Sequence, residues 1–404
     1  MTEIKKTCKL ENVGYDIRGP IAEEAARMRA EGIDIISLNT GNPANFGFYA
    51  PKAVEDALIA NIKGSEAYSD SAGIPEAIEA IRAYSARKGI LELSDRDIYT
   101  GNGVSELINI ALQALIDNGD EILIPTPDYP LWSSVATLCG GKVIHYICDE
   151  ANGWLPDTDD IKRKVGPRTK AIVIINPNNP TGALYPKDAL LDILEIARRN
   201  KLVVFSDEIY DRLVMDGGKH FASAALAPDL FTVTFNGLSK SHMVAGFRCG
   251  WMCLSGDRAR AADYIEGIRM LASMRLCANV PAQSIIRAAL DDPWDAAPLL
   301  APGGRIYEQR ECIFNAVADI PGLSAVKPKA AFYLFPKIDV EKYHILDDER
   351  FVLDFLHEHH VLMTHGRGFN WPYADHFRIV YLPVAEELRR IAEKMRAFLR
   401  DYRQ

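Results

Sequence analysis

The stretch AIVIINPNNPTG (171–182) joins a short apolar run directly to a polar segment rich in asparagine and proline. Two later stretches repeat this arrangement, LVVFSDEIYD (202–211) and LFTVTFNGLSK (230–240). Uninterrupted apolar runs of this length are typical of strands buried on both faces of a sheet. In such sheets, ligands bind at the carboxyl ends of the strands. We therefore expect the polar ends of the three stretches to lie together and to form a ligand site.

The sequence upstream extends this pattern. EILIP (121–125) and KVIHYI (142–147) predict two more buried strands, and IYT (98–100) predicts a strand that precedes a helix. Helices are expected at 53–62, 76–88, 104–117, 130–139 and 186–200. The alternation predicts an α/β fold with a mostly parallel sheet covered by helices.

Beyond about residue 310 the pattern changes to short strands and two helices, at 349–360 and 385–402. This is typical of a smaller α+β domain. The segment PGGR (302–305) marks the expected boundary. We predict three parts, which are an N-terminal arm joined to the small domain (1–48), a large domain (49–305) and a small C-terminal domain (306–404).

Composition excludes several classes of protein. The chain has 404 residues and a net charge of −9, which argues against a nucleic-acid partner. No apolar run approaches the roughly 20 residues that span a bilayer, and none follows the first lysines as in a secretory signal, so a cytoplasmic protein is expected. The seven cysteines show no Cys-x-x-Cys spacing. We therefore expect neither a disulfide framework nor a metal site.

The polar strand ends carry residues suited to pyridoxal 5'-phosphate, a cofactor that acts as an electron sink. Lys240 would bond to its aldehyde and later move a proton as a general base. Asp207 would pair with the ring nitrogen, while Tyr210 and Asn179 would share the ring oxygen. Each residue alone has an ordinary alternative role, such as a surface charge for the lysine or a helix cap for the aspartate. Their combination favours the cofactor site.

A phosphate group needs donors of its own. Arg248 offers a planar fork and Ser239 a hydroxyl. The segment GNGVS (101–105) begins a helix, whose free N–H groups favour an anion. Tyr129, in PTPDYPLW (125–132), could stack on the cofactor ring or simply pack in its loop.

A substrate carboxylate would require a second arginine. Arg378, in HFRIVYLP (376–383), is the candidate, although an arginine facing solvent from an edge strand is the alternative. Gly41, in NTGNP (39–43), could bring its backbone N–H close to the same carboxylate.

Taken together, NPNNPTG, SDEIYD, FNGLSK, VAGFRCGW and FRIVYLP resemble the motifs of class I/II aminotransferases of fold type I, over nearly the whole chain. The longer blocks YDIRGP (15–20), GNGVSELI (101–108) and FNWPYADHFRIV (369–380) resemble the bacterial glutamate–pyruvate (alanine) subgroup. One departure concerns the serine or threonine that many relatives have three residues before the lysine, because Gly237 stands there in this chain. Ser239 would then supply the hydroxyl.

The resemblance implies reversible ping-pong transfer of an amino group, from L-alanine to 2-oxoglutarate, giving pyruvate and L-glutamate. It also implies a homodimer with shared active sites, in which Tyr68 of one subunit reaches the phosphate bound by the other. Phosphate contacts from Gly103, Val104 and Ser105 follow from the same resemblance. Open alternatives are an aspartate, branched-chain or aromatic donor, a β-lyase on the same fold, and, least favoured, a non-enzymatic effector-sensing module.

A site that accepts both alanine and glutamate must read the distal carboxylate of glutamate without leaving a buried charge unpaired when alanine binds. A mobile arginine meets this requirement. Arg18 in YDIRGP is the first candidate, with Tyr15 lining the same pocket. Arg275 is the alternative, since it stands roughly where related aspartate transaminases keep such an arginine.

Overall fold

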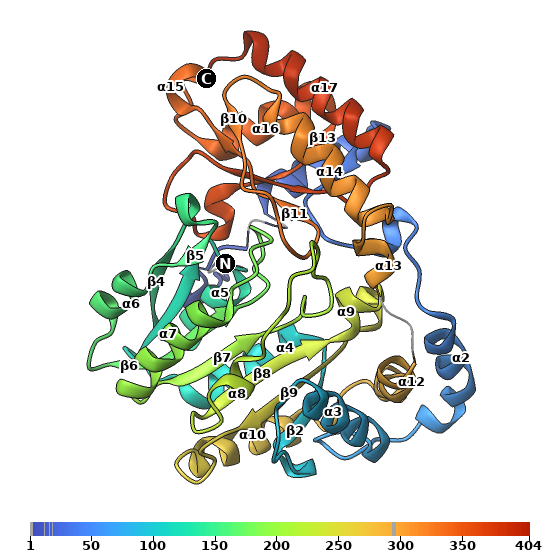
Figure 1. Ribbon diagram of the computed structural model, residues 1–404, viewed down its shortest axis with the longest axis vertical. Coiled ribbons are helices and arrows are strands. Elements are labelled where there is room, and N and C mark those ends of the chain that lie inside the picture. Colours follow the sequence, from blue (N-terminus) through green and yellow to red (C-terminus); the bar gives the residue numbers. More distant parts are fainter. Residues whose placement is uncertain (1–2, 12, 16, 18, 293–295) are drawn as a thin grey trace.

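The computed structural model describes residues 3–11, 13–15, 17, 19–292 and 296–404. Its centre is a large sheet, seen at mid-height and below in Figure 1. The described strands of this sheet, in spatial order, are β2 (Ile98–Asn102), β9 (Cys249–Ser255), β8 (Thr232–Gly237), β7 (Val203–Asp207), β6 (Thr169–Ile175), β3 (Glu121–Thr126), β4 (Lys142–Asp149) and β5 (Leu155–Pro156). The four pairs from β8 to β4 are parallel, and the pairs involving β2, β9 and β5 are antiparallel. The prediction of a mostly parallel α/β sheet is confirmed.

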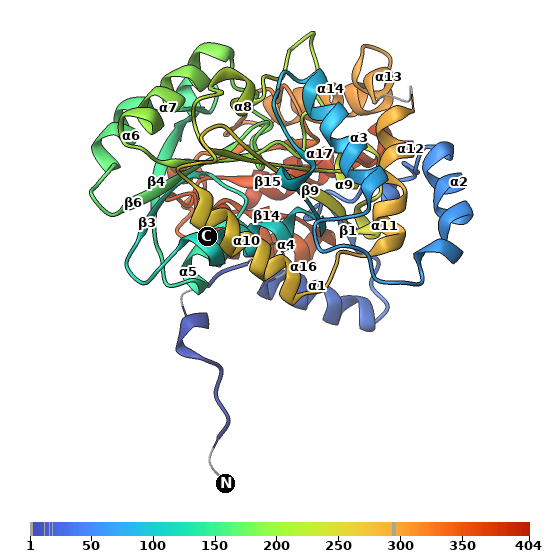
Figure 2. The same cartoon turned by 90° about the horizontal axis from the view of Figure 1, so that it is seen from below.

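Helices cover both faces of this sheet, as Figure 2 shows. One face packs against α4 (Val104–Leu115), α5 (Leu131–Leu138) and α10 (Ala262–Met274), and the other against α6 (Thr158–Lys164), α7 (Lys187–Arg199) and α8 (Ser223–Leu226). The sequence explains α7 directly, because Leu190, Ile193, Leu194 and Ala197 recur at helical spacing and are all buried. Beside β2 and β9 lie α2 (Lys52–Asn61), α3 (Pro75–Arg87), α11 (Val280–Ser284) and α12 (Ile286–Asp291).

A second layer of structure, at the top of Figure 1, combines the two ends of the chain. Its helices include α1 (Pro20–Ala30), α13 (Ala297–Leu300), α14 (Arg305–Ala318), α15 (Val340–Tyr343), α16 (Asp348–His359) and α17 (Ala385–Asp401). Its strands are β1 (Ile36–Ser37) paired with β13 (Val361–Leu362), β10 (Leu323–Ser324) paired with β12 (Lys337–Ile338), and the sheet β11 (Tyr333–Leu334), β15 (Phe377–Val380) and β14 (Thr364–His365).

The N-terminal segment divides between the two parts. The turn η1 (Cys8–Leu10) lies near α5, and residues 3–7 extend away from the body in Figure 2. Further along, α1 contacts α16, and β1 runs parallel to β13. The division at residues 48 and 305 stays a prediction.

The strand register places the polar motifs at one edge. Ile175 at the end of β6 pairs with Asp207 at the end of β7, which in turn pairs with Phe235 near the end of β8. Because these strands are parallel, the segments that follow them begin side by side. In the described part of the chain, no helix is both long and apolar enough to cross a membrane.

Candidate active site

The structure brings most of the predicted site residues together around one cavity between the sheet edge and the C-terminal layer. Its empty volume is about 790 Å³, part of it open to solvent. The predicted residues that line it are Tyr15, Gly41, Val104, Ser105, Tyr129, Asn179, Asp207, Tyr210, Ser239, Lys240, Arg248 and Arg378.

Lys240 lies on the short helix α9 (Leu238–Ser241), directly after β8. Its Nζ donates a hydrogen bond to the backbone oxygen of Gly41 at 2.6 Å. Burial, reinforced by the nearby positive charges of Arg378 and Arg248, lowers the pKa of Lys240 to about 7. At neutral pH a large fraction of the amine is therefore uncharged, which is the nucleophilic form.

This lowered pKa predicts a stability cost. The unfolded chain binds a proton at Lys240 up to its ordinary pKa of 10.5, whereas the folded, ligand-free protein loses it near pH 7. The contribution of Lys240 to the free energy of unfolding therefore rises between pH 7 and 10.5. Below that window, the folded protein carries the full cost of a charged amine in a buried site. We expect Lys240→Met to stabilise the ligand-free protein by on the order of 2 kcal/mol at pH 6.5, with the difference shrinking toward pH 10.5.

Urea unfolding of both proteins at several pH values measures this difference. Lys187→Met is the matched control, because Lys187 is exposed on α7 and forms no ion pair with the described residues. A pH-independent difference for Lys240→Met would contradict the assigned cause.

Asp207 ends β7, is 3% exposed, and is the one carboxylate among the lining residues of the described cavity. Its Oδ2 accepts a hydrogen bond from the Trp132 indole at 3.1 Å. Burial is the main cause that raises the pKa of Asp207 to about 6. The carboxylate is thus ionised at neutral pH but poorly compensated, so a cation beside it would be stabilised.

Arg378 lies on β15, the middle strand of its sheet, and is 1% exposed. It donates to Asn179 Oδ1 at 2.9 Å and to the backbone oxygen of Asn39, and its guanidinium carbon lies 4.6 Å from the centre of the Tyr333 ring. Its Nε is buried without a hydrogen-bond partner. The alternative role for Arg378, an arginine that faces solvent from an edge strand, is therefore excluded.

Tyr210 follows Asp207 by three residues and also faces the cavity. Its hydroxyl is 2.7 Å from that of Tyr333, a lining residue that the sequence reasoning missed. Asn179 uses its amide oxygen on Arg378, which leaves its NH₂ group to donate into the cavity. One of the two hydroxyls donates to the other, so the pair and the Asn179 amide together leave one hydroxyl and one NH₂ group to donate to a ligand oxygen.

Arg248 and the start of α4 form the far side of the cavity. Arg248 donates to the backbone oxygen of Ala245 at 2.8 Å. Gly103 does not line the cavity but must be glycine, since its φ is +79° and a Cβ would lie 2.1 Å from Arg248 Nη2. The first N–H groups of α4, at Val104 and Ser105, have no partner within the helix and are available to an anion.

Packing also explains the departure at Gly237. A Cβ at this position would lie 2.6 Å from the Cys249 backbone oxygen and 2.9 Å from the Gly250 Cα. A serine there would collide with β9, so the hydroxyl that lines the cavity is that of Ser239.

Two tyrosines close the cavity from the N-terminal side. The hydroxyls of Tyr15 and Tyr129 are 2.9 Å apart, and their rings meet edge to face. This contact joins the N-terminal segment to the loop after β3, as expected if the segment covers the site.

Besides Gly103, three predicted residues are not placed in the cavity. Tyr68 is 81% exposed and lies outside the lining of this single chain. Arg275 is engaged with Glu106 Oε2 at 2.8 Å and with two backbone oxygens. Arg18 lies outside the described residues.

The charges of the site indicate an anionic ligand. Lys240, Arg248 and Arg378 face one cavity, and none of them forms an ion pair with the residues that the structure describes. Cations held away from solvent without counter-ions are costly, above all Arg378, which is 1% exposed. A ligand that carries a phosphate and a carboxylate would compensate them.

Comparison with known proteins decides the family. The model of the family described as aminotransferase class I and II matches residues 33–395. The chain belongs to this family. Its members use pyridoxal phosphate, in keeping with the chemistry of the cavity.

Individual relatives cover the whole chain. Glutamate-pyruvate aminotransferase AlaA of Haemophilus influenzae is 54% identical over 99% of each chain, and that of Escherichia coli K12 is 52% identical over 100% of each. The crystal structure of an aminotransferase from Escherichia coli superposes with a TM-score of 0.98, at 52% identity and with full coverage of both chains. The aminotransferase fold is thus established over the whole length.

Proposed function

We propose that this aminotransferase is an alanine transaminase, which reversibly converts L-alanine and 2-oxoglutarate to pyruvate and L-glutamate with pyridoxal phosphate as cofactor. The observation that carries the proposal is the uncompensated set Lys240, Arg248 and Arg378 in one cavity with Asp207. The printed activity of the full-length relatives supports the choice of substrates.

The residues present fit the cofactor. Arg248, Ser239 and the N–H groups at the start of α4 would hold its phosphate, and Asp207 would hold its ring nitrogen in the protonated form. When bound, the cofactor withdraws electrons from the substrate's α-carbon. Tyr210 and Asn179 would donate hydrogen bonds to its ring oxygen.

Lys240 would have two roles. Its amine would hold the cofactor between reactions, and, once displaced by the substrate amine, it would move a proton to and from the α-carbon as a general base. The lowered pKa of Lys240, about 7, suits this role at neutral pH. Arg378 would bind the substrate carboxylate, with Gly41 alongside it.

Gly41 allows the close approach that this arrangement requires. A Cβ at Gly41 would lie 2.3 Å from the Tyr333 hydroxyl and 2.6 Å from Phe332. A larger residue would displace Tyr333, whose ring lies against Arg378.

The donor specificity is tested by supplying the purified enzyme with a panel of amino acids and 2-oxoglutarate. Alanine should be the best donor, ahead of aspartate, branched-chain and aromatic amino acids. A β-lyase would instead release pyruvate and ammonia, without glutamate, from an amino acid that carries a leaving group on its β-carbon, such as cysteine.

The distal carboxylate of glutamate needs a further cation, which we assign to Arg18, with Tyr15 lining the pocket. Tyr15 lies at the cavity beside Tyr129, which supports this choice. Arg275 is the alternative, and its ion pair with Glu106 would have to open.

We also propose a homodimer in which Tyr68 reaches the phosphate bound by the other protomer. Tyr68 is 81% exposed in the single chain. Other large apolar side chains, such as Tyr49, Ile59 and Met274, are also exposed, although less than Tyr68. Molar mass from light scattering tests the dimer.

Asp207→Asn should lower kcat by about 100-fold, because a neutral amide no longer holds the ring nitrogen in its protonated, electron-withdrawing form. The amide keeps an oxygen that can accept the hydrogen bond from Trp132. Steady-state kinetics with alanine measures the loss. Wild-type kcat in this variant would mean that another group pairs with the ring.

A further inference from the structure

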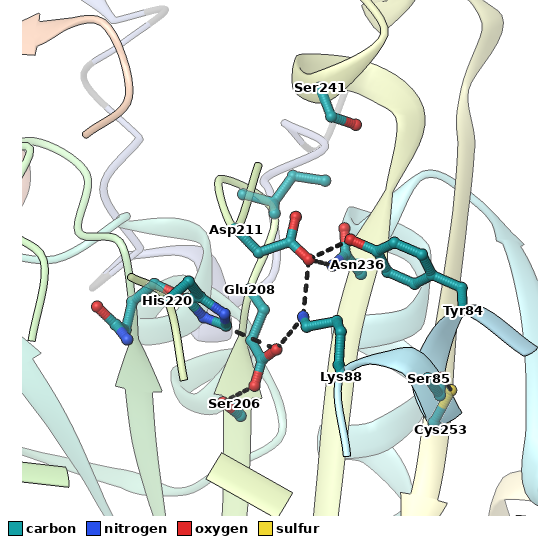
Figure 3. Close-up of polar contacts among 12 residues, drawn as sticks. Tyr84, Ser85, Lys88, Ser206, Glu208, Asp211, His220, Asn236, Ser241 and Cys253 are labelled. Carbon is teal, nitrogen blue, oxygen red and sulfur yellow. Dashed lines mark hydrogen bonds and ion pairs between the residues drawn. The ribbon is translucent and has the colours of Figure 1, made fainter. Parts of the chain in front are cut away.

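A second group of buried polar side chains lies just outside the cavity and has no part in the proposed reaction (Figure 3). Lys88 follows the last residue of α3 and places its Nζ 2.5 Å from Glu208 Oε2 and 2.7 Å from Asp211 Oδ2. The two carboxylate side chains are each 1% exposed, and that of Lys88 is 16% exposed. This is a buried ion cluster of one cation and two anions.

The charges in the cluster are maintained by one another. Burial alone would lower the pKa of Lys88, but the Asp211 and Glu208 carboxylates outweigh it and raise that pKa. Burial would likewise raise the pKa of Asp211, yet Lys88 and its hydrogen-bond donors lower it. Removing Lys88 would leave two buried carboxylates facing each other without the lysine's charge. The nearby His220, whose Nε2 lies 3.8 Å from Glu208 Oε2, has a pKa that burial lowers.

The cluster is connected to the active site through alternating residues. At the end of β7 and just after it, Asp207, Ile209 and Tyr210 line the cavity. Glu208 and Asp211 belong to the cluster instead. Each proposed cofactor ligand of this segment therefore has a neighbour in the chain that is bound to Lys88.

A second connection leads to Lys240. Asn236, on β8, donates from Nδ2 to Asp211 Oδ2 at 2.8 Å, and its Oδ1 accepts from the Gly237 backbone N–H at 2.7 Å. Gly237 directly precedes α9, which carries Lys240. Tyr84 of α3 also donates to Asp211 Oδ2, at 2.5 Å. The cluster thus links α3 to the ends of both β7 and β8.

We propose that Lys88 is a positioning residue of the active site, which holds the 207–211 turn through Glu208 and Asp211 and the end of β8 through Asn236. Its effect on catalysis rests on the proposed function, whereas its effect on the two segments does not. Lys88 itself does not line the cavity and contacts neither of the proposed ligand sites.

The first test is Lys88→Met, with hydrogen exchange measured by mass spectrometry on the cofactor-free protein. Peptides covering 203–213 and 232–241 should exchange roughly tenfold faster, because local opening is no longer opposed by the ion cluster. A peptide covering β15, where Arg378 lies, should exchange as in the wild type. Faster exchange over the whole sheet would show a general loss of stability and overturn the positioning role.

Kinetics supply the second readout. Because small displacements of reacting groups lower rates steeply, kcat should fall by about 10- to 100-fold. KM for alanine should change less than about threefold, since Arg378 and Asn179 lie outside the cluster. Lys88→Arg, whose guanidinium can reach both carboxylates, should recover most of kcat. Failure of this rescue, or a loss confined to KM, would contradict the proposal.

Asn236→Ala removes the connection to the end of β8 and leaves the connection of Lys88 to the 207–211 turn. This variant also tests the proposal if Lys88→Met fails to fold. Exchange should increase at 232–241 and stay near the wild-type rate at 203–213. Wild-type exchange at 232–241 would overturn this connection. Lys187→Met is the control for loss of a lysine, and it should leave exchange and kinetics unchanged. If the wild-type enzyme showed no transamination, the proposed function would fail while the exchange results still tested Lys88.

Discussion

Lys240→Ala is expected to lower transamination by at least about 10⁴-fold, because the variant loses both the nucleophile and the general base. The phosphate ligands are unaffected, since Arg248 and the start of α4 come from other parts of the chain. The variant should therefore still bind pyridoxal phosphate, without a covalent bond. Stopped-flow absorbance with alanine measures the rate.

Two measurements separate this result from a loss of cofactor binding. Dialysis should remove the cofactor from the variant faster than from the wild type, and borohydride should fix it covalently only in the wild type. An added small amine could restore part of the proton transfer in the variant. Turnover near the wild-type value would refute the role of Lys240.

The strand ends could be predicted because the residues at and around each end are enough to mark it. A buried strand must be apolar throughout, so the first polar residues after it mark its end, and parallel pairing brings these ends together. Asp207 and Lys240 were found this way. The helix predicted at 186–200 was found at Lys187–Arg199 for a similar reason, since its buried residues recur at helical spacing.

Other features depend on distant pairing, which leaves no local signal. Tyr333 belongs to FYLF (332–335), where a cavity-lining tyrosine looks the same as a core aromatic residue. The strand expected at 98–100 continues to Asn102 because it pairs with β9. Lys88 and Glu208 are 120 residues apart, so their contact required the fold to be known.

The site also illustrates why a functional cavity is locally unfavourable. The pKa of Lys240 is lowered and that of Asp207 is raised, so each is held in an environment that disfavours its charged form. Arg378 is buried without a carboxylate partner among the described residues. The surrounding packing must offset these costs until the ligands arrive.

Arg378→Gln should lower kcat/KM for alanine by about 10³-fold, which corresponds to roughly 4 kcal/mol for removal of one partner from a buried ion pair. Arg378→Lys keeps the charge but loses the planar fork, so its loss should be smaller. Ethylamine, which is alanine without its carboxylate, provides the matched control. It should react slowly with the wild type and equally slowly with Arg378→Gln, because ethylamine has no carboxylate that could pair with Arg378. An equal fractional loss for alanine and ethylamine would mean that Arg378 acts through Asn179 and Tyr333 on the shape of the cavity rather than by binding the carboxylate.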